Sequence, residues 1–134
     1  MVASSLQLVL VTPETTLLDE PVDSLQFPLF DGQIGVLPGR APLLGFLGYG
    51  ELQLTRGGTT RRFFIDGGFV QIKGPVVSIL THGAVPADQI SEDQAESQLQ
   101  AALRRVPTTD AGYAAKVKEQ ERARQMLALA QKTH

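Results

Sequence analysis

The chain has 134 residues, of which 43% are apolar and 6% aromatic, and its formal net charge is −2. The slightly negative net charge argues against nucleic acid as a partner, because phosphate binding needs an excess of clustered lysine and arginine. The absence of cysteine excludes disulfides and thiolate metal sites, and no apolar run approaches the roughly 20 residues of a membrane span.

The first part of the chain predicts β-strands. Residues 6–11 place leucine at every second position, which is typical of a half-buried strand. Residues 22–29 form a similar run, whose apolar markers are Val22, Leu25 and Phe27. Two further pairs of strands are expected to turn at Gly57-Gly58 and at Gly74-Pro75.

Short strands at a spacing of about ten residues predict an all-β sandwich, a flattened barrel of about ten short strands. Pro28, Pro38 and Pro42 cannot donate to a sheet ladder, so we expect them at edges and bends. The run Asp66–Phe69 (DGGF) predicts a tight turn.

The composition changes near residues 82–89, after which alanine, glutamine, glutamate, lysine and arginine dominate and favour helix. Ser91 followed by Gln94 forms a capping box that starts a first helix, and Pro107 ends it. Four residues follow the spacing of one helical face: Leu99, Ala102, Leu103 and Val106.

Thr109 or Asp110 is expected to cap a second helix over about residues 111–130. The chain therefore divides into a sandwich at 1–85 and an antiparallel two-helix hairpin at 86–134. Much of the apolar surface of the hairpin is alanine, which buries little area per residue. We expect the two helices to be weakly joined and able to detach.

No residue pattern carries recognisable catalytic chemistry. His82 reads as a polar strand end and His134 as a terminal residue, and no phosphate-binding GxxxxGK[ST] motif occurs. The glycines of the DGGF run lack the following helix that a dinucleotide site needs. Three carboxylates near Pro21 read as a solvated edge: Asp19, Glu20 and Asp23. We therefore expect no catalytic residue, no cofactor and no metal ion.

The segment DGQIGVLPGRAPLL, residues 31–44, carries two prolines and three glycines. It resembles a loop in the epsilon subunit of F-type ATP synthases, whose usual pattern is Gly-acid-x-Gly-x-x-Pro-Gly-His-Ala-Pro-Leu-Leu. Residues 63–85 and 8–28 resemble the later signature and the opening strands of that family. Gln33 replaces the frequent acid, and Arg40 replaces the usual histidine.

The resemblance implies a small β-sandwich joined to a two-helix hairpin. A subunit of this family is a non-catalytic part of the rotating central stalk and binds the gamma subunit and the polar loops of the c-ring. It couples ring rotation to ATP synthesis, and it can inhibit ATP hydrolysis by extending its C-terminal helices.

The resemblance also implies two sets of contact residues. The first would bind the c-ring and the gamma subunit: Asp31, Gly32, Gln33, Gly35, Pro38, Gly39, Arg40, Ala41 and Pro42. The second would meet acidic loops of the catalytic beta subunits, with the alpha subunits nearby, when the helices extend: Lys116, Lys118, Arg122 and Arg124. The alternative for the second set is a solvated helix face whose charge Glu119 and Glu121 balance.

Some bacterial members of the family bind ATP at the start of the first helix through an acid and an arginine. Here Ser91 and Gln94 stand at those positions. Both charge-assisted bonds are lost, which predicts weak or no ATP binding.

Two other functions fit the residues without the resemblance: an unrelated β-sandwich interaction module with a helical tail, and a small enzyme. The enzyme lacks an acid/base cluster. The resemblance implies a peripheral position on the cytoplasmic face of a bacterial inner membrane. The missing transit peptide favours this place over an organellar inner or thylakoid membrane.

Overall fold

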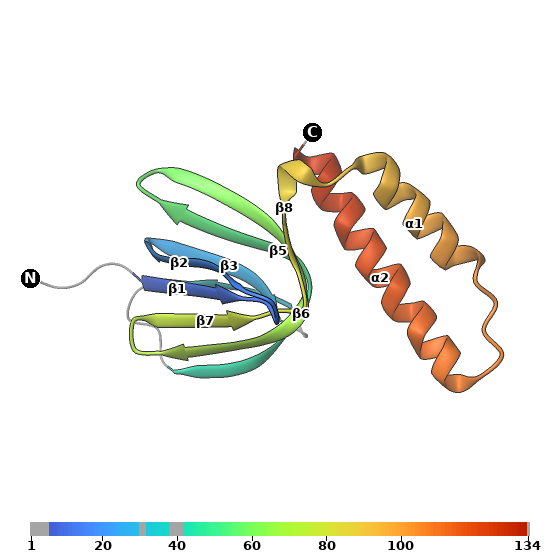
Figure 1. The fold of residues 1–134 in the computed structure, drawn as a ribbon, viewed down its shortest axis with the longest axis horizontal. Helices are drawn as coiled ribbons and strands as arrows, with labels where there is room; N and C mark the ends of the chain where they lie inside the picture. The colour runs from blue at the N-terminus through green and yellow to red at the C-terminus, as the bar shows by residue number, and fades with distance from the viewer. Residues whose placement is uncertain (1–5, 30–31, 38–41, 134) are drawn as a thin grey trace, which may run out of the picture. The chain divides into compact units, whose positions relative to one another are not determined.

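The computed structural model describes residues 6–29, 32–37 and 42–133. The chain divides into two compact units, Met1–Ala84 and Val85–His134, called here the β-unit and the helical unit (Figure 1). The strands are: β1 (Leu6–Val11), β2 (Thr16–Val22), β3 (Ser24–Leu29), β4 (Gly32–Val36), β5 (Leu43–Arg56), β6 (Thr59–Lys73), β7 (Val76–Leu80) and β8 (Ala84–Pro86). The helices are: the 3₁₀ helix η1 (Ala87–Gln89), α1 (Glu92–Arg104) and α2 (Asp110–Thr133).

The strands form one sheet in the order β2-β1-β7-β6-β5-β3-β4, with β8 paired to β6 outside this path. The pairs along this path are antiparallel except β1 and β7, which are parallel. The predicted fold class, a β-sheet unit followed by two helices, is confirmed. The described residues form eight strands where about ten short ones were expected, because β5 and β6 run for 14 and 15 residues. Figure 1 shows both long strands curving.

The core of the β-unit follows the predicted alternation. Leu6, Leu8 and Leu10 of β1 are fully buried, while the residues between them are only half-buried. The predicted apolar markers of the second run are buried as well: Val22, Leu25 and Phe27. Each such side chain stabilises the fold by about 1.5–3 kcal/mol relative to an exposed position.

The turn expected at Asp66–Phe69 is wrong, because these residues lie inside β6. Gly67 and Gly68 instead give β6 a local bend, with positive φ angles of 68° and 123°. At Gly68 the backbone passes the end of β7 so closely that an added Cβ would lie 2.0 Å from the carbonyl oxygen of Leu80. The buried hydroxyl of Thr81 closes this bend by donating to the carbonyl oxygen of Gly67 at 2.6 Å. Only glycine fits here.

Pro28 lies in β3, which has a strand on either side. It coincides with an irregularity of the β3–β5 pairing, where the register shifts between Gln26 and Leu29. A proline fits there because the ladder is already interrupted. Pro42 directly precedes β5 and is exposed, and Pro38 lies outside the described residues.

The helical unit starts as predicted, since the Ser91 hydroxyl accepts a hydrogen bond from the Gln94 backbone N–H at 3.2 Å. Thr109 caps α2, accepting from the Gly112 backbone N–H at 3.0 Å. The expected apolar face of the first helix is partly wrong. Ala102 is buried, but Leu103 is 40% exposed and Val106 is 84% exposed. The reason is that α1 already ends at Arg104, so Val106 belongs to the connection between the helices.

We predict that Gly68→Ala destabilises the fold by about 3 kcal/mol or more, since the new Cβ would collide with backbone that cannot move aside. The matched control is Gly58→Ala, because Gly58 also has a positive φ, of 81°, but has open space around it. That variant should cost only about 1 kcal/mol. Urea unfolding measures both, and equal losses would show that the close approach at Gly68 does not exist.

Candidate interaction surface

The strand β4 carries most of the described residues of the predicted contact segment and forms one end of the sheet. It pairs with β3, and no other described strand pairs with it. Its residues alternate: Ile34 and Val36 pack toward the core, while Gln33 and Gly35 are exposed. The Gln33 side-chain amide donates to the backbone carbonyl of Glu51 at 3.2 Å, which fixes the direction of Gln33.

The structure thus brings Gly32, Gln33 and Gly35 together on one strand, and it places Pro42 just before β5. Five predicted contact residues lie outside the described residues: Asp31, Pro38, Gly39, Arg40 and Ala41.

The two ends of the sheet differ in how they are protected against pairing with another strand. The strand β2 carries Asp19, Glu20 and Pro21, and charges and proline are the usual protection of an edge. The strand β4, in contrast, has neither a charged residue nor a proline. The backbone groups on the free side of β4 are therefore the better template for another polypeptide.

The three carboxylates near Pro21, predicted to be a solvated edge, serve as structural acceptors. Asp19 accepts from a glutamine of β1, and Glu20 pairs with two arginines of the β5–β6 hairpin. Asp23 accepts from the backbone N–H of Gly57 in the turn of that hairpin at 2.8 Å.

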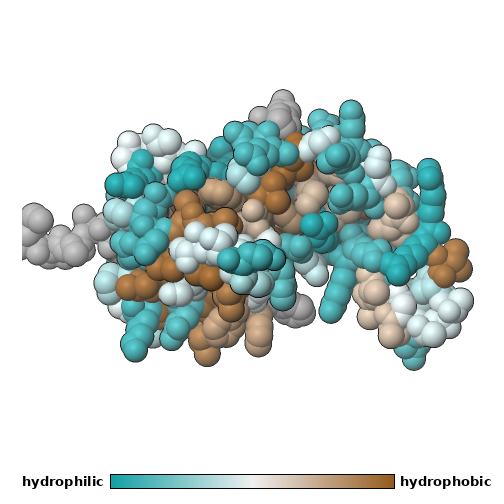
Figure 2. All heavy atoms as spheres, in the orientation of Figure 1, coloured by the Kyte–Doolittle hydropathy of each residue, from teal (hydrophilic) through white to brown (hydrophobic). Residues whose placement is uncertain are grey.

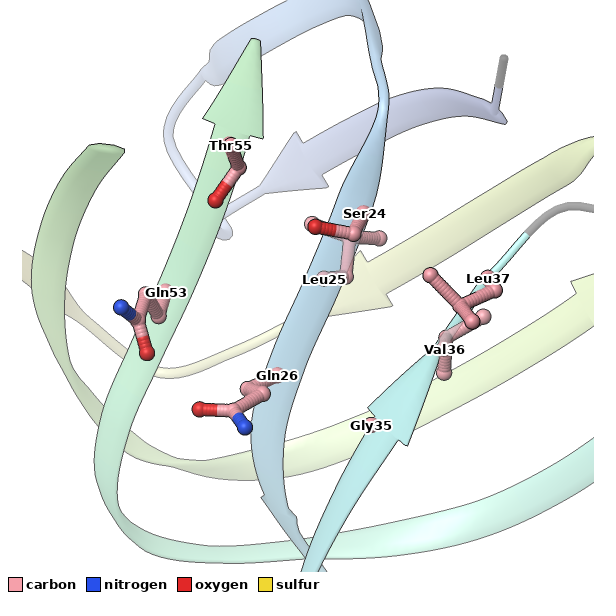
Figure 3. Close-up of a pocket in the computed structure, with 8 residues that line it drawn as sticks. All are labelled: Ser24, Leu25, Gln26, Gly35, Val36, Leu37, Gln53 and Thr55. Carbon is pink, nitrogen blue, oxygen red and sulfur yellow. The ribbon is translucent and has the colours of Figure 1, made fainter. Parts of the chain in front are cut away.

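A shallow groove of about 410 Å³ runs beside β4 (Figure 3). Its polar floor comes from β3 and β5, where Gln26 lies opposite Gln53 and Ser24 lies opposite Thr55. Gln26 is also opposite Gly35 of β4, and the missing side chain at Gly35 leaves that side of the groove open. The groove is lined by uncharged residues, among them the apolar Leu25, Val36 and Leu37, so it suits an uncharged partner segment that brings apolar as well as polar groups.

An apolar row crosses three strands on the outer face of the sheet. Phe46 of β5 is opposite Phe69 of β6, which is opposite Leu80 of β7. We call these three residues the outer row. The rings of Phe46 and Phe69 meet edge to face, with their centroids 6.0 Å apart. Phe46 is 72% exposed and Leu80 is 50% exposed.

Leu44 of β5, two residues before Phe46, is 64% exposed and extends the outer row. Leu37, directly after β4, is 66% exposed but lies beside Ser24 and Thr55 at the other end of β5. Figure 2 shows apolar surface among the polar residues of the β-unit. Contiguous exposed apolar surface of this kind marks interaction sites. Sequence reasoning missed the outer row, although a signal was present: Leu43-Leu44 and Phe46-Leu47 put apolar residues on both faces of one strand.

The basic run of α2 separates into two pairs. Lys116 is half-buried and its Nζ donates to the backbone carbonyl of Leu103 at 3.2 Å. Arg122 is half-buried too, and its Nη1 lies 3.5 Å from the side-chain oxygen of Gln98. Both face α1. Lys118 and Arg124 are exposed and make no ion pair with any residue that the structure describes.

The two acidic residues named with this run have partners of their own on the helices. Glu119 forms an ion pair with Arg105 at the end of α1, and Glu121 accepts from the side chain of Gln125 at 3.0 Å. The hydrogen bond to Glu119 and the charge of that carboxylate raise the pKa of the Arg105 guanidinium. Arg105 therefore keeps its charge at any working pH.

Among the residues that the structure describes, no group of three or more histidine, cysteine, aspartate or glutamate side chains could hold a metal ion. His82 is exposed. Within the same residues, no helix has the length and apolarity that crossing a bilayer requires. The geometry thus defines an interaction protein: a sheet with an unprotected edge and an exposed apolar row, followed by two helices with exposed cations.

Residues 5–87 match the family model of the ATP synthase delta/epsilon chain β-sandwich domain. The ATP synthase epsilon chain of Rhodopirellula baltica is 46% identical over 74% of this chain and 77% of its own length. That of Roseiflexus is 41% identical over 69% of this chain and 66% of its own. The chain belongs to the ATP synthase epsilon chain family. It is a non-catalytic subunit of the central stalk of an F-type ATP synthase.

Solved structures agree over the full fold. A chain in the mitochondrial ATP synthase assembly of Euglena gracilis, which includes the c-ring, superposes with a TM-score of 0.84 at 25% identity. It covers 100% of this chain and 84% of its own length. A chain in the central stalk and c-ring assembly of the Tetrahymena thermophila enzyme has the same fold, with a TM-score of 0.75 at 16% identity over 93% of this chain and 96% of its own.

Proposed function

We propose that this subunit binds the gamma subunit and the loops of the c-ring through its β-unit, and so transmits ring rotation to the catalytic head. The observation that carries the proposal is the exposed outer row beside an unprotected sheet edge. A subunit that turns with a stalk must not slip, which requires an interface of the standard size, on the order of 800 Å² per partner. The outer row, Leu37 and Leu44 offer apolar area for such an interface.

The chemistry of the two surfaces suggests which partner each one takes. The apolar outer row suits the gamma subunit, because apolar surface gains most from burial in a packed interface. The edge strand β4, with its exposed Gln33, suits the polar loops of the c-ring. The family resemblance assigns the following segment, up to Arg40, to the same contact. Arg40 would keep a positive charge at every working pH, unlike the usual histidine.

For the helical unit we infer a role in inhibiting ATP hydrolysis. Lys118 and Arg124 are accessible in the structure and can meet acidic loops on the beta subunits, with the alpha subunits nearby. Lys116 and Arg122 belong to the same predicted set but already have acceptors on α1. Inhibition should therefore depend first on the exposed pair.

The same proposal includes weak or no ATP binding and a peripheral position at the cytoplasmic face of a bacterial membrane. Ser91 stands where ATP-binding relatives carry an acid, and its hydroxyl is used to cap α1. Gln94 stands at the arginine position and brings no charge to a phosphate. The epsilon chains of Rhodopirellula baltica and Roseiflexus, to which the sequence is similar, are bacterial.

We expect Phe46→Asp to weaken binding to a gamma subunit–c-ring complex at least about tenfold, because a carboxylate would be buried against apolar surface. The isolated fold should be preserved, since Phe46 is exposed. Leu17→Asp is the matched control, because Leu17 is an exposed leucine on the opposite edge strand β2. Titration calorimetry with both variants tests the assignment, and a similar loss for Leu17→Asp would remove the outer row from the interface.

Lys118→Glu should relieve inhibition of ATP hydrolysis in the assembled enzyme, since it replaces attraction to an acidic loop by repulsion. Lys73→Glu makes the same change of charge on an exposed residue at the end of β6 and should leave the rate unaltered. Steady-state hydrolysis assays compare the two. If the enzyme that carries Lys118→Glu hydrolyses ATP at the parental rate, Lys118 has no inhibitory role.

A further inference from the structure

We propose that the closed form of the helical hairpin is held by a hinge clasp, which consists of two polar contacts around the connection at residues 105–109. The first contact joins Lys116 to the backbone carbonyl of Leu103. The second is the ion pair between Arg105 and Glu119. The consequence for inhibition rests on the function proposed above, but the clasp itself is a property of the isolated chain.

Both contacts bridge the two helices where the chain reverses. Leu103 lies in the last turn of α1, whose carbonyl groups have no partner within the helix and carry its negative dipole end. The Lys116 ammonium, at 3.2 Å, satisfies one of these carbonyl groups with a positive charge from α2. Arg105 is the residue directly after α1, and its partner Glu119 lies one turn beyond Lys116. Releasing both contacts frees the connection to change direction.

No large apolar side chain is buried at this end of the hairpin among the described residues, where the small Ala102 is the buried apolar residue of the last turn of α1. Four apolar side chains near the connection are exposed: Leu103, Val106, Tyr113 and Val117. The large buried side chains of α2 lie in its C-terminal half: Met126, Leu127 and Leu129. Figure 2 shows apolar surface at the end of the hairpin where the helices are joined. The hinge angle is therefore set mainly by polar contacts.

The clasp also decides which cations are available to a partner. Lys116 can donate either to the carbonyl of Leu103 on α1 or to an acidic group of a partner. Arg122 can likewise donate either to Gln98 of α1 or to such an acidic group. An acidic partner that engages these two residues thus favours the open form, whereas Lys118 and Arg124 can bind it without opening. The four basic residues divide into a pair coupled to opening and a pair that is not.

The clasp makes opening sensitive to salt. Both side chains of the Arg105–Glu119 pair are about half exposed, and exposed ion pairs are weak and are screened by salt. The equilibrium constant for opening the hairpin should increase modestly with ionic strength. The loss of either contact should increase it by about twofold to fivefold.

The experiment measures the distance between α1 and α2 in the full-length chain. Because the chain has no cysteine, exposed positions can be labelled specifically through Ser97→Cys and Ala128→Cys, which lie on the two helices away from the connection. Pulsed electron resonance between two spin labels then gives the open fraction. Lys116→Ala and Glu119→Gln should each raise this fraction about twofold to fivefold, and the variant carrying both should lose most of its response to salt.

The matched control is Lys118→Ala, which removes the same charge two positions from Lys116 and should leave the open fraction and its salt response unchanged. If Lys116→Ala and Glu119→Gln both behave like Lys118→Ala, the hinge clasp is refuted. Hydrolysis assays separate this result from the proposed function. A rise in opening without a change in inhibition supports the clasp and contradicts the inhibitory role, while unchanged opening overturns the clasp alone.

Discussion

The close approach of β6 to the end of β7 at Gly68 is the constraint on which the interaction surface depends. A Cβ at this position would meet the Leu80 carbonyl oxygen at 2.0 Å, so the missing side chain lets the strands bend and still keep their register. Directly after this bend, Phe69 pairs with both Phe46 and Leu80. The same bend therefore keeps the core residues of β6 inside and lines up the outer row outside. We propose that this exposed row is a surface for a partner.

The helical unit follows a different physical rule. Its buried seam contains small residues, among them Ala95, Ala102 and Ala123, which gain little from burial compared with leucine or phenylalanine. The polar contacts around the connection therefore contribute a larger share of the stability of the helix pair. Such contacts are weak and form and break readily. We therefore infer that the two helices separate more readily than the strands of the β-unit.

Sequence reasoning predicted the alternating core, the two hairpin turns, the cap at Ser91, a cap at Thr109 or Asp110, and the family. These features depend on local patterns, namely alternation, glycine turns and capping residues. The turn predicted at Asp66–Phe69 was wrong, because Gly67 and Gly68 form a bend inside the continuous strand β6. Sequence reasoning also missed the outer row, because that row joins residues from three strands whose register no local pattern reveals. The division of the basic run depends on which face of α2 meets α1, and the irregular apolar spacing of that helix did not specify the face.

The central claim is that the β4 edge and the outer row form the docking surface for the rest of the stalk. Hydrogen exchange of the full chain, free and bound to the gamma subunit–c-ring complex, tests it most directly. Binding should slow exchange at the backbone amides of β4, from Gln33 to Val36, and at the start of β5 around Phe46, while the amides of β2 should exchange as before. Slower exchange along β2, with β4 and β5 unchanged, would contradict the account.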